Sequence, residues 1–230
     1  QFVRGSGAIA GLIAQWVGSY TTQREACDVA LGESYAYIAA GEGGLCILDV
    51  SDPRDPREVG SCDISGVAQD VALAGSYVFL ADKWRALHIM DAHDRTNPHE
   101  VGSCSLAGRS VGVALAGRHA YVAAGAHGLS VVDISDPTNP SEVGSYQTLG
   151  EAYGVAASGR HAYVAAGELG LHVVEVARGS AAREIASCAT RGFAQAVALS
   201  GNCAYVADRE DGLCTVDVSE PQSPHQISSF

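Results

Sequence analysis

Short apolar segments recur along the chain at a fixed interval. Variants of the sequence Asp-Val-Ala-Leu stand at residues 28–31, 70–73, 112–115, 154–157 and 196–199. Each segment begins 42 residues after the one before it, so the five units fit together without an insertion or a deletion. An aromatic column keeps the same phase, at Tyr37, Phe79, Tyr121, Tyr163 and Tyr205. A repeat of this length is typical of solenoids and propellers, in which each unit buries its apolar surface against its neighbours.

Each unit reads as four short strands separated by turns. In the second unit, three apolar strands are expected, at residues 71–74, 77–81 and 87–91. In the first unit, two Asp-Pro pairs within residues 51–56 end the third strand and start a turn, and a fourth strand follows at 58–62. No stretch has a sustained helical period. Because the first three strands are apolar on both faces, both faces must be covered. The pattern predicts an all-β fold, a five-bladed β-propeller of four-stranded antiparallel blades.

The ends of the chain lie outside the complete units. We expect residues 1–14 to lie outside the repeats and 15–230 to form the propeller, with units at 28–69, 70–111, 112–153, 154–195 and 196–230. Residues 15–22 contain a copy of the fourth strand. This spare strand is predicted to close the ring by pairing with the third strand of the last unit, near residues 213–218, or to pair with another molecule. A six-bladed ring, with a degenerate blade from residues 1–27, is the alternative.

The third strand and the turn after it carry a motif. Residues 128–140 read Gly-Leu-Ser-Val-Val-Asp-Ile-Ser-Asp-Pro-Thr-Asn-Pro, and residues 44–56 and 212–224 match nearly as well. The second and fourth units depart from it in the turn. The motif resembles the LVIVD repeat, and the resemblance covers residues 28–230. It implies a bacterial or archaeal β-propeller of a kind often found in exported or surface proteins, with no shared catalytic residues.

Charge narrows the classes of partner. The chain has 14 basic and 26 acidic residues, a formal net charge of −12. It therefore has no cationic surface to neutralise the phosphates of a nucleic acid, and an anionic membrane surface is disfavoured for the same reason. No apolar run approaches the roughly 20 residues of a membrane-spanning helix. A protein partner is the expectation.

One face of the predicted propeller has variable loops. Strand alternation places the loops after the second and fourth strands on this face, and variable loops on a fixed scaffold are how recognition sites are built. Trp84, between Lys83 and Arg85, is the best anchor candidate, since aromatic and Arg residues dominate binding hot spots. The predicted binding face comprises Lys83, Trp84, Arg85, Arg109, His127, Glu151, Tyr153, Phe193 and Arg209. Ordinary variation among loops is the alternative interpretation.

Candidate chemistry is sparse. The sequence has no Gly-x-Ser-x-Gly, His-Glu-x-x-His or phosphate-binding loop motif, and no catalytic residue is assigned. Four carboxylates are expected near the axis on the variable face, where oxygen ligands could hold Ca²⁺. They are Asp28, Asp70, Asp82 and Asp208. The alternative is that they bond to loop amides, and we expect no cofactor. The predicted function is a non-catalytic interaction or surface scaffold; a carbohydrate- or ligand-binding propeller, and after it a hydrolase or lyase, are the alternatives.

The number of cysteines is evidence about the cellular compartment of the protein. The chain has seven cysteines, and an odd number cannot all pair within one chain. The odd number therefore favours a reducing compartment. The family resemblance, by contrast, favours export or the cell surface. Cys46 and Cys62 are expected within one residue of register on adjacent strands, so they are the candidate disulfide of an exported chain. Ligands on neighbouring blades are too far apart for zinc, because packed sheets are about 10 Å apart and Zn bonds about 2.0–2.3 Å long.

Overall fold

The computed structural model describes residues 16–177 and 181–229. The first sheet consists of β1 (Asp28–Gly32), β2 (Tyr35–Ala39), β3 (Leu45–Asp49) and β4 (Arg57–Cys62). The second contains β5 (Ala68–Ala74), β6 (Tyr77–Asp82), β7 (Ala86–Asp91) and β8 (His99–Ser105). The third contains β9 (Gly112–Ala116), β10 (His119–Ala123), β11 (Leu129–Asp133) and β12 (Ser141–Tyr146). The fourth contains β13 (Gly154–Ser158), β14 (His161–Ala165), β15 (Leu171–Val176) and β16 (Ala182–Cys188). The fifth contains β17 (Ala196–Ser200), β18 (Cys203–Ala207), β19 (Leu213–Asp217) and β20 (His225–Ser229).

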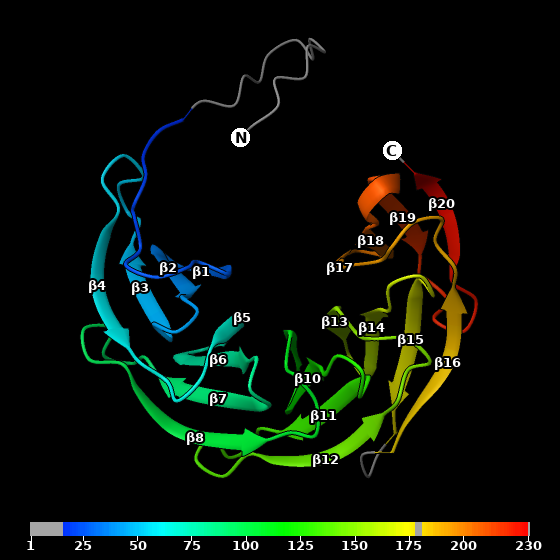
Figure 1. Ribbon diagram of the computed structural model, residues 1–230, viewed down its shortest axis with the longest axis horizontal. Coiled ribbons are helices and arrows are strands. Elements are labelled where there is room, and N and C mark those ends of the chain that lie inside the picture. Colours follow the sequence, from blue (N-terminus) through cyan, green and yellow to red (C-terminus); the bar gives the residue numbers. More distant parts are fainter. Residues whose placement is uncertain (1–15, 178–180, 230) are drawn as a thin grey trace.

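Each sheet is an antiparallel meander whose four strands pair in chain order. Figure 1 shows the five sheets side by side along an arc, with the first strand of each near the centre and the fourth at the periphery. The first and last sheets flank an opening in this arc. The only helix in the described ranges is a single 3₁₀ turn at Arg209–Asp211. The prediction of an all-β fold of five four-stranded blades is confirmed.

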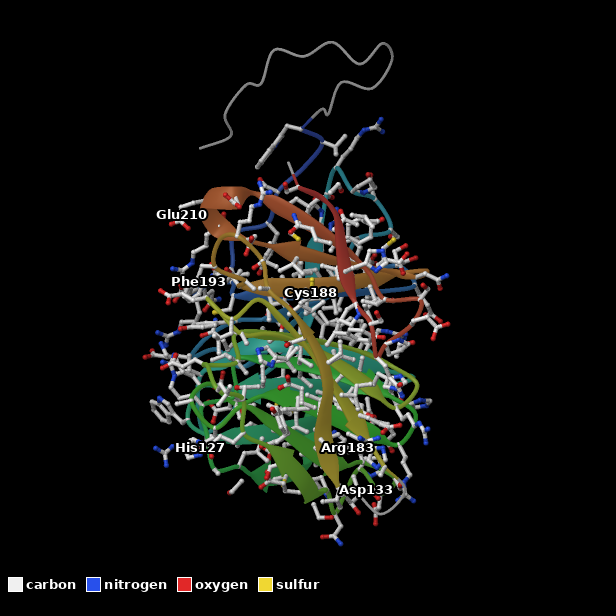
Figure 2. The ribbon with its side chains drawn as sticks, turned by 90° about the vertical axis from the view of Figure 1, so that its right-hand side faces the viewer. His127, Asp133, Arg183, Cys188, Phe193 and Glu210 are labelled. Atoms are coloured by element: carbon white, nitrogen blue, oxygen red, sulfur yellow. The ribbon has the colours of Figure 1, made fainter. Side chains whose placement is uncertain are left out.

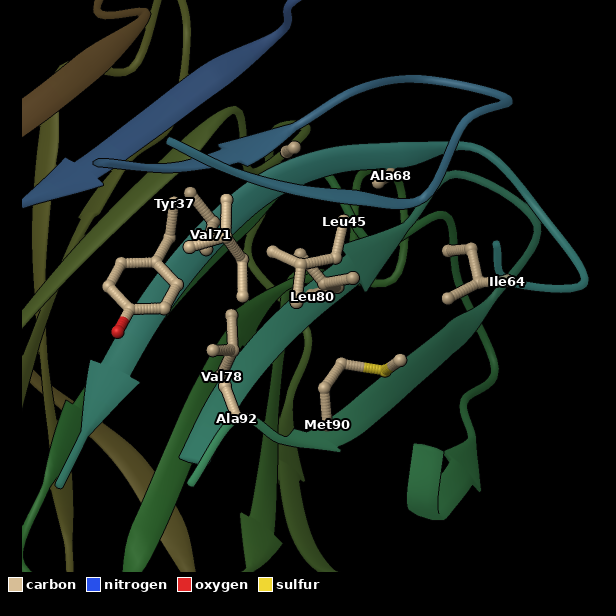
Figure 3. Packing of buried hydrophobic residues seen from close by; sticks show 11 residues of the cluster. Tyr37, Leu45, Ile64, Ala68, Val71, Val78, Leu80, Met90 and Ala92 are labelled. Carbon is tan, nitrogen blue, oxygen red and sulfur yellow. The ribbon is translucent and has the colours of Figure 1, made fainter. Parts of the chain in front are cut away.

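The core consists of apolar layers between neighbouring sheets. Between the first and second sheets, Leu45 and Leu80 are fully buried and pack with Tyr37, Val71 and Met90 (Figure 3). Each fully buried Leu contributes about 1.5–3 kcal/mol relative to an exposed one. The same layer recurs between each later pair of sheets. These layers explain why the second and third strands are apolar on both faces.

Residues 16–22 of the predicted spare strand form no strand. The third strand of the last sheet, β19, pairs with β20, so the predicted pairing of the spare segment with residues 213–218 is wrong. The segment instead lies against the first sheet, where the Tyr20 hydroxyl donates a hydrogen bond to the Glu58 carboxylate. The physical reason is that β19 already has a local partner next to it in the chain. The six-bladed alternative requires a degenerate blade from residues 1–27. Residues 1–15 of that blade lie outside the described ranges.

Candidate functional site

The antiparallel meander brings alternate loops to the same side of the molecule. We call this side the loop face; it carries the loops between the second and third strands of each sheet and those between successive sheets. Figure 2 shows His127, Phe193 and Glu210 on this side, with Asp133 and Arg183 opposite. All nine residues of the predicted binding face lie in these loops: Lys83, Trp84, Arg85, Arg109, His127, Glu151, Tyr153, Phe193 and Arg209.

The loop between β6 and β7 presents Trp84 to solvent. Its indole is 66% exposed, the largest aromatic surface that the described part of this face offers. The loop is held from beneath by Asp82, whose Oδ1 accepts hydrogen bonds from the backbone N–H groups of Val67 (2.7 Å) and Trp84 (3.0 Å). Arg85 follows with a positive φ of 79°, a conformation that costs a side-chain-bearing residue energy. The exposed indole is therefore set on an anchored loop.

A second cluster joins three loops that are distant in the sequence. The rings of Tyr153 and Phe193 meet edge to face, with centroids 4.8 Å apart. The Arg209 guanidinium lies 3.9 Å from the Phe193 centroid, and its Nε donates a hydrogen bond to Gln195 Oε1 at 3.0 Å. Arg209 also has a positive φ, of 42°. Aromatic edge-to-face and cation–π contacts fix these side chains without burying them completely.

Between these two features lies a hollow of about 240 Å³. It brings together five of the predicted residues, which are Arg85, Arg109, His127, Glu151 and Tyr153. Burial, together with the neighbouring Glu151 carboxylate, raises the pKa of the Tyr153 phenol, so Tyr153 offers a neutral hydroxyl. The hollow thus combines two guanidinium groups, an imidazole, a carboxylate and a phenol.

The acidic candidates for calcium do not form one site. Asp82 bonds to loop amides as described, and Asp208 accepts hydrogen bonds from Thr190 Oγ1 (2.7 Å) and the Gly192 N–H (2.9 Å). Both carboxylates are 1% exposed and act as internal loop anchors. Only Asp28 and Asp70 are brought together. Among residues 16–177 and 181–229, no group of three or more His, Cys, Asp or Glu could hold a metal ion.

Asp28 and Asp70 lie at a hollow of about 500 Å³ formed by the innermost strands. Asp28 accepts a hydrogen bond from the Val71 N–H (3.1 Å), and Asp70 accepts one from the Val113 N–H (2.6 Å). Burial, and then the hydrogen bond with Asp28, raise the pKa of Asp70 to about 8. Two carboxyl groups in contact cannot both ionise cheaply, so they hold a proton between them. A proton-sharing pair is a poor ligand set for Ca²⁺, because calcium needs ionised oxygens in larger number.

Two exposed leucines on the loop face were missed by the sequence analysis. Leu149 is 90% exposed between β12 and β13, and Leu169 is 39% exposed between β14 and β15. Their signal was a large apolar residue at a loop position where the other units have a polar residue, glycine or alanine. The Gln195 side chain accepts the hydrogen bond that orients Arg209. Gln195 stands at the same position of the repeat as four residues that line the inner hollow, namely Cys27, Gln69, Val111 and Tyr153.

The candidate disulfide between Cys46 and Cys62 is not formed. All seven cysteines are free. Cys46 lies opposite Ser61, and Cys62 lies opposite Leu45, so the two thiols point to opposite faces of the sheet. A shift of one residue in register exchanges the faces of a strand, which is why the expected alignment fails. In the second sheet the register is the same: Cys104 lies opposite Leu87, and His88 Nδ1 lies 3.1 Å from Glu100 Oε1.

The comparisons with known proteins agree with this architecture. A sequence model of the LVIVD repeat matches residues 23–64, 65–105, 107–148, 149–190 and 191–230. A functionally unknown protein from Desulfotomaculum acetoxidans DSM 771 is similar in structure, with a TM-score of 0.76 at 12% identity over 91% of this chain and 73% of that one. The computationally designed Ika8 protein has a TM-score of 0.71 at 11% identity.

The match with Ika8 covers 91% of this chain, which spans 63% of the designed protein. No curated protein matches the chain. In the part of the chain that the structure describes, no helix is long and apolar enough to cross a membrane. Five matches that together cover nearly all of residues 23–230, on five sheets of one design, place this chain in the LVIVD repeat family.

Proposed function

We propose that this chain is a non-catalytic interaction module that binds a protein partner through its loop face. The observation that carries the proposal is the juxtaposition of an exposed, anchored Trp84 with the Tyr153–Phe193–Arg209 cluster on one face. Trp, Tyr and Arg are the residues that most often dominate the energy of protein interfaces. In four of the five units, by contrast, the aromatic residue of the second strand is buried in the layers between blades.

The backbone supports the same assignment. Three described residues other than glycine have a positive φ, and two of them, Arg85 and Arg209, stand on the loop face. Neighbouring units have glycine at or next to these positions, for example Gly125 and Gly128. An arginine in the left-handed region costs of order 1–3 kcal/mol, and such residues cluster at functional sites. The guanidinium groups thus stand where glycine would be the stabilising choice.

The test of this proposal compares the two faces of the molecule. We expect Trp84→Ala and Arg209→Ala each to weaken the binding of a captured partner by about 2 kcal/mol or more, a 30-fold loss. Both side chains are exposed, so the melting temperature should change little. The matched controls Arg54→Ala and Arg118→Ala change exposed arginines on the opposite face.

The partner would be identified by cross-linking and mass spectrometry, and its affinity measured by calorimetry. The proposal fails if the control variants weaken binding while Trp84→Ala does not. A carbohydrate or other small ligand is a second candidate, which the inner hollow favours, because about 500 Å³ lies in the range of ligand pockets. Binding in a glycan array that is lost in Gln69→Ala, and kept in Trp84→Ala, would support that candidate instead.

A further inference from the structure

A hollow of about 450 Å³ lies between the third and fourth sheets, on the side opposite the loop face. Arg118, His119 and Tyr121 line it from the third sheet, and Arg160 and Val176 line it from the fourth. Both sheets have a neighbouring sheet on either side (Figure 1), so the hollow belongs to an interior interface of the arc. Of the described residues that line it, two are arginines and none is acidic.

Two polar atoms of the described residues at this hollow are buried without a hydrogen-bond partner. They are the hydroxyl of Tyr121, whose side chain is 0% exposed, and Nε2 of His119. Burial raises the pKa of the Tyr121 phenol, so this hydroxyl keeps its proton and can donate it to an acceptor. Nε2 of His119 can donate as well, in the tautomer that carries its proton there. Buried polar groups without partners destabilise a folded chain, and a ligand that accepts hydrogen bonds from them removes that cost.

The interface between the first and second sheets shows this place filled by a side chain. There Arg95 Nε donates a hydrogen bond to the Tyr37 hydroxyl at 3.0 Å, and the guanidinium carbon lies 4.4 Å from the centroid of the Tyr35 ring. Another nitrogen of Arg95 donates to the Glu33 carboxylate at 3.0 Å, and this carboxylate balances its charge. The Tyr37 hydroxyl therefore has the partner that the Tyr121 hydroxyl lacks.

The interface between the third and fourth sheets keeps the phenol of this arrangement and reverses the charges around it. Tyr121 stands two repeat lengths after Tyr37. The residues at four neighbouring positions of the repeat change as follows: Arg95 is replaced by Gly179, Glu33 by Gly117, Ser34 by Arg118 and Ser76 by Arg160. The guanidinium that fills the first place and its balancing carboxylate are thus both replaced by glycine. Two new guanidinium groups border the hollow instead, which favours an anion over a cation.

These two arginines are held only by ion pairs at the surface. The Arg118 guanidinium lies 3.4 Å from Asp133 Oδ2, and that of Arg160 lies 3.1 Å from Glu175 Oε1. Arg183 lies 2.5 Å from the other oxygen of Glu175, so three guanidinium groups share two carboxylates. The side chains of Arg118 and Arg160 are 63% and 62% exposed, and ion pairs at such positions are weak. Each guanidinium can therefore turn toward an anion in the hollow at little cost.

We propose that this hollow binds a small organic anion, whose carboxylate or phosphate group is held by Arg118 and Arg160. The planar guanidinium group matches the geometry of both anions. The Tyr121 hydroxyl and His119 Nε2 supply further donors. A volume of about 450 Å³ is in the range of pockets for small organic ligands, so the body of the ligand packs beside Val176. This site lies on the other side of the molecule from the proposed binding face, and it is a second function.

The experiment compares two probes of the same planar shape and opposite charge. Benzoate and benzamidinium are titrated into the chain of residues 1–230 at neutral pH and low salt, and binding is followed by NMR chemical shifts. We expect benzoate to bind with a Kd of about 1 mM or lower, and benzamidinium at least about 10-fold more weakly. Phenyl phosphate is the second anion, and the tighter binder of the two identifies the anionic group. Binding of benzamidinium alone, or of none of the three probes, overturns the proposal.

Substitutions locate the bound anion. Arg118→Ala and Arg160→Ala should each weaken its binding at least about 10-fold, because each removes one charged donor. Arg54→Ala is the matched control, since Arg54 is exposed on the same side of the molecule and does not line the hollow. Anion binding that survives both substitutions at the hollow, or that Arg54→Ala weakens equally, overturns the proposal. A loss in Arg109→Ala alone would place the anion in the loop-face hollow and would also overturn it.

Tyr121→Phe separates a role in binding from a role in folding. It should weaken anion binding by about 3- to 10-fold without lowering the melting temperature, because the hydroxyl that it removes has no partner in the folded chain. The second unit has Phe79 at the same position, so the ring alone fits this layer. Unchanged anion binding in Tyr121→Phe would contradict the assigned donor. The two proposals fail independently, because the loop face is tested with a protein partner and the hollow with small ions.

Discussion

In four of the five blades, the aspartate that ends the third strand accepts a hydrogen bond from the backbone N–H two residues further along. Asp133 Oδ1 accepts hydrogen bonds from the Ser135 N–H (2.9 Å) and the Ser135 hydroxyl, and these lower the pKa of Asp133. The same backbone bond, two residues along the chain, is made by Asp49, Asp91 and Asp217. In the fourth unit the longer Glu175 pairs with Arg160 at 3.1 Å instead. This column is therefore structural, whereas Asp28 and Asp70, which share another position of the repeat, have a different role.

The raised pKa of Asp70 makes stability depend on pH. An aspartate with a pKa of about 8 in the folded state and of 3.8 in the unfolded state keeps its proton only when folded. Its contribution to the free energy of unfolding is complete below pH 4 and is lost as the pH rises through 8. We expect Asp70→Asn, which mimics the protonated group, to flatten the fall in melting temperature between pH 5 and 9.

The control for this prediction is Asp136→Asn, at a carboxylate whose pKa is lowered by bonds to Thr138. Any loss of stability in Asp136→Asn should be the same at every pH above about 5, because the wild-type carboxylate is ionised there in both the folded and the unfolded state. Thermal melts across the pH range measure both variants. A melting curve for Asp70→Asn that falls as steeply as that of the wild type would contradict the shared proton.

At the scale of the element, the turn between the first and second strands is set by backbone conformation. Gly75, Gly117, Gly159 and Gly201 occupy it with φ of 58–60°, and a Cβ at any of them would meet nothing within 4 Å. The constraint is therefore the left-handed φ and not space. In the first unit Glu33 takes the corresponding place with φ of 55°, and its carboxylate accepts a hydrogen bond from Arg95 at 3.0 Å.

Substituting one of these glycines measures that constraint. Gly117→Ala should lower the free energy of unfolding by about 1 kcal/mol, because a Cβ in the left-handed region costs roughly 1–2 kcal/mol. Gly117→Asn should cost less, since asparagine tolerates this conformation. Denaturant melts compare the two variants. Equal losses in both would indicate that the space around the turn matters after all.

At the scale of the whole molecule, a residue's environment depends on which blade it belongs to. Leu129 and Leu213 occupy the same position of the repeat, and the first is 0% exposed whereas the second is 41% exposed. The difference arises because the third sheet packs against the fourth, whereas no further sheet follows the last one within the described residues. The layers between neighbouring sheets stabilise the arc.

The pair of leucines tests this contrast directly. Leu129→Ala should lower the free energy of unfolding by about 2–5 kcal/mol, the usual cost of a cavity in a core. Leu213→Ala should cost less than about 1 kcal/mol when the chain is monomeric, since its side chain is partly solvated already. Urea melts at low protein concentration provide the measurement. Similar losses at the two positions would mean that Leu213 is as well buried as Leu129.

The sequence alone determined the blades. Five units of 42 residues without an insertion fix the number of sheets, and strand alternation fixes which loops share a face, because both follow from the chain's own spacing. The nine residues of the predicted binding face therefore lie where they were expected. Whether they bind a partner stays a prediction.

The tertiary structure decided what depends on neighbours outside the unit. Figure 1 shows the sheets along an open arc, and how neighbouring sheets are placed relative to one another cannot be deduced from the spacing of the repeat. The Asp28–Asp70 pair comes from two adjacent units, and the Tyr153–Phe193 contact from loops 40 residues apart. Cys46 and Cys62 lie on opposite faces of the sheet because their positions differ by one residue of register, next to the bulge between Ile47 and Leu48. Periodicity specifies each blade, whereas side-chain packing between blades decides how they meet.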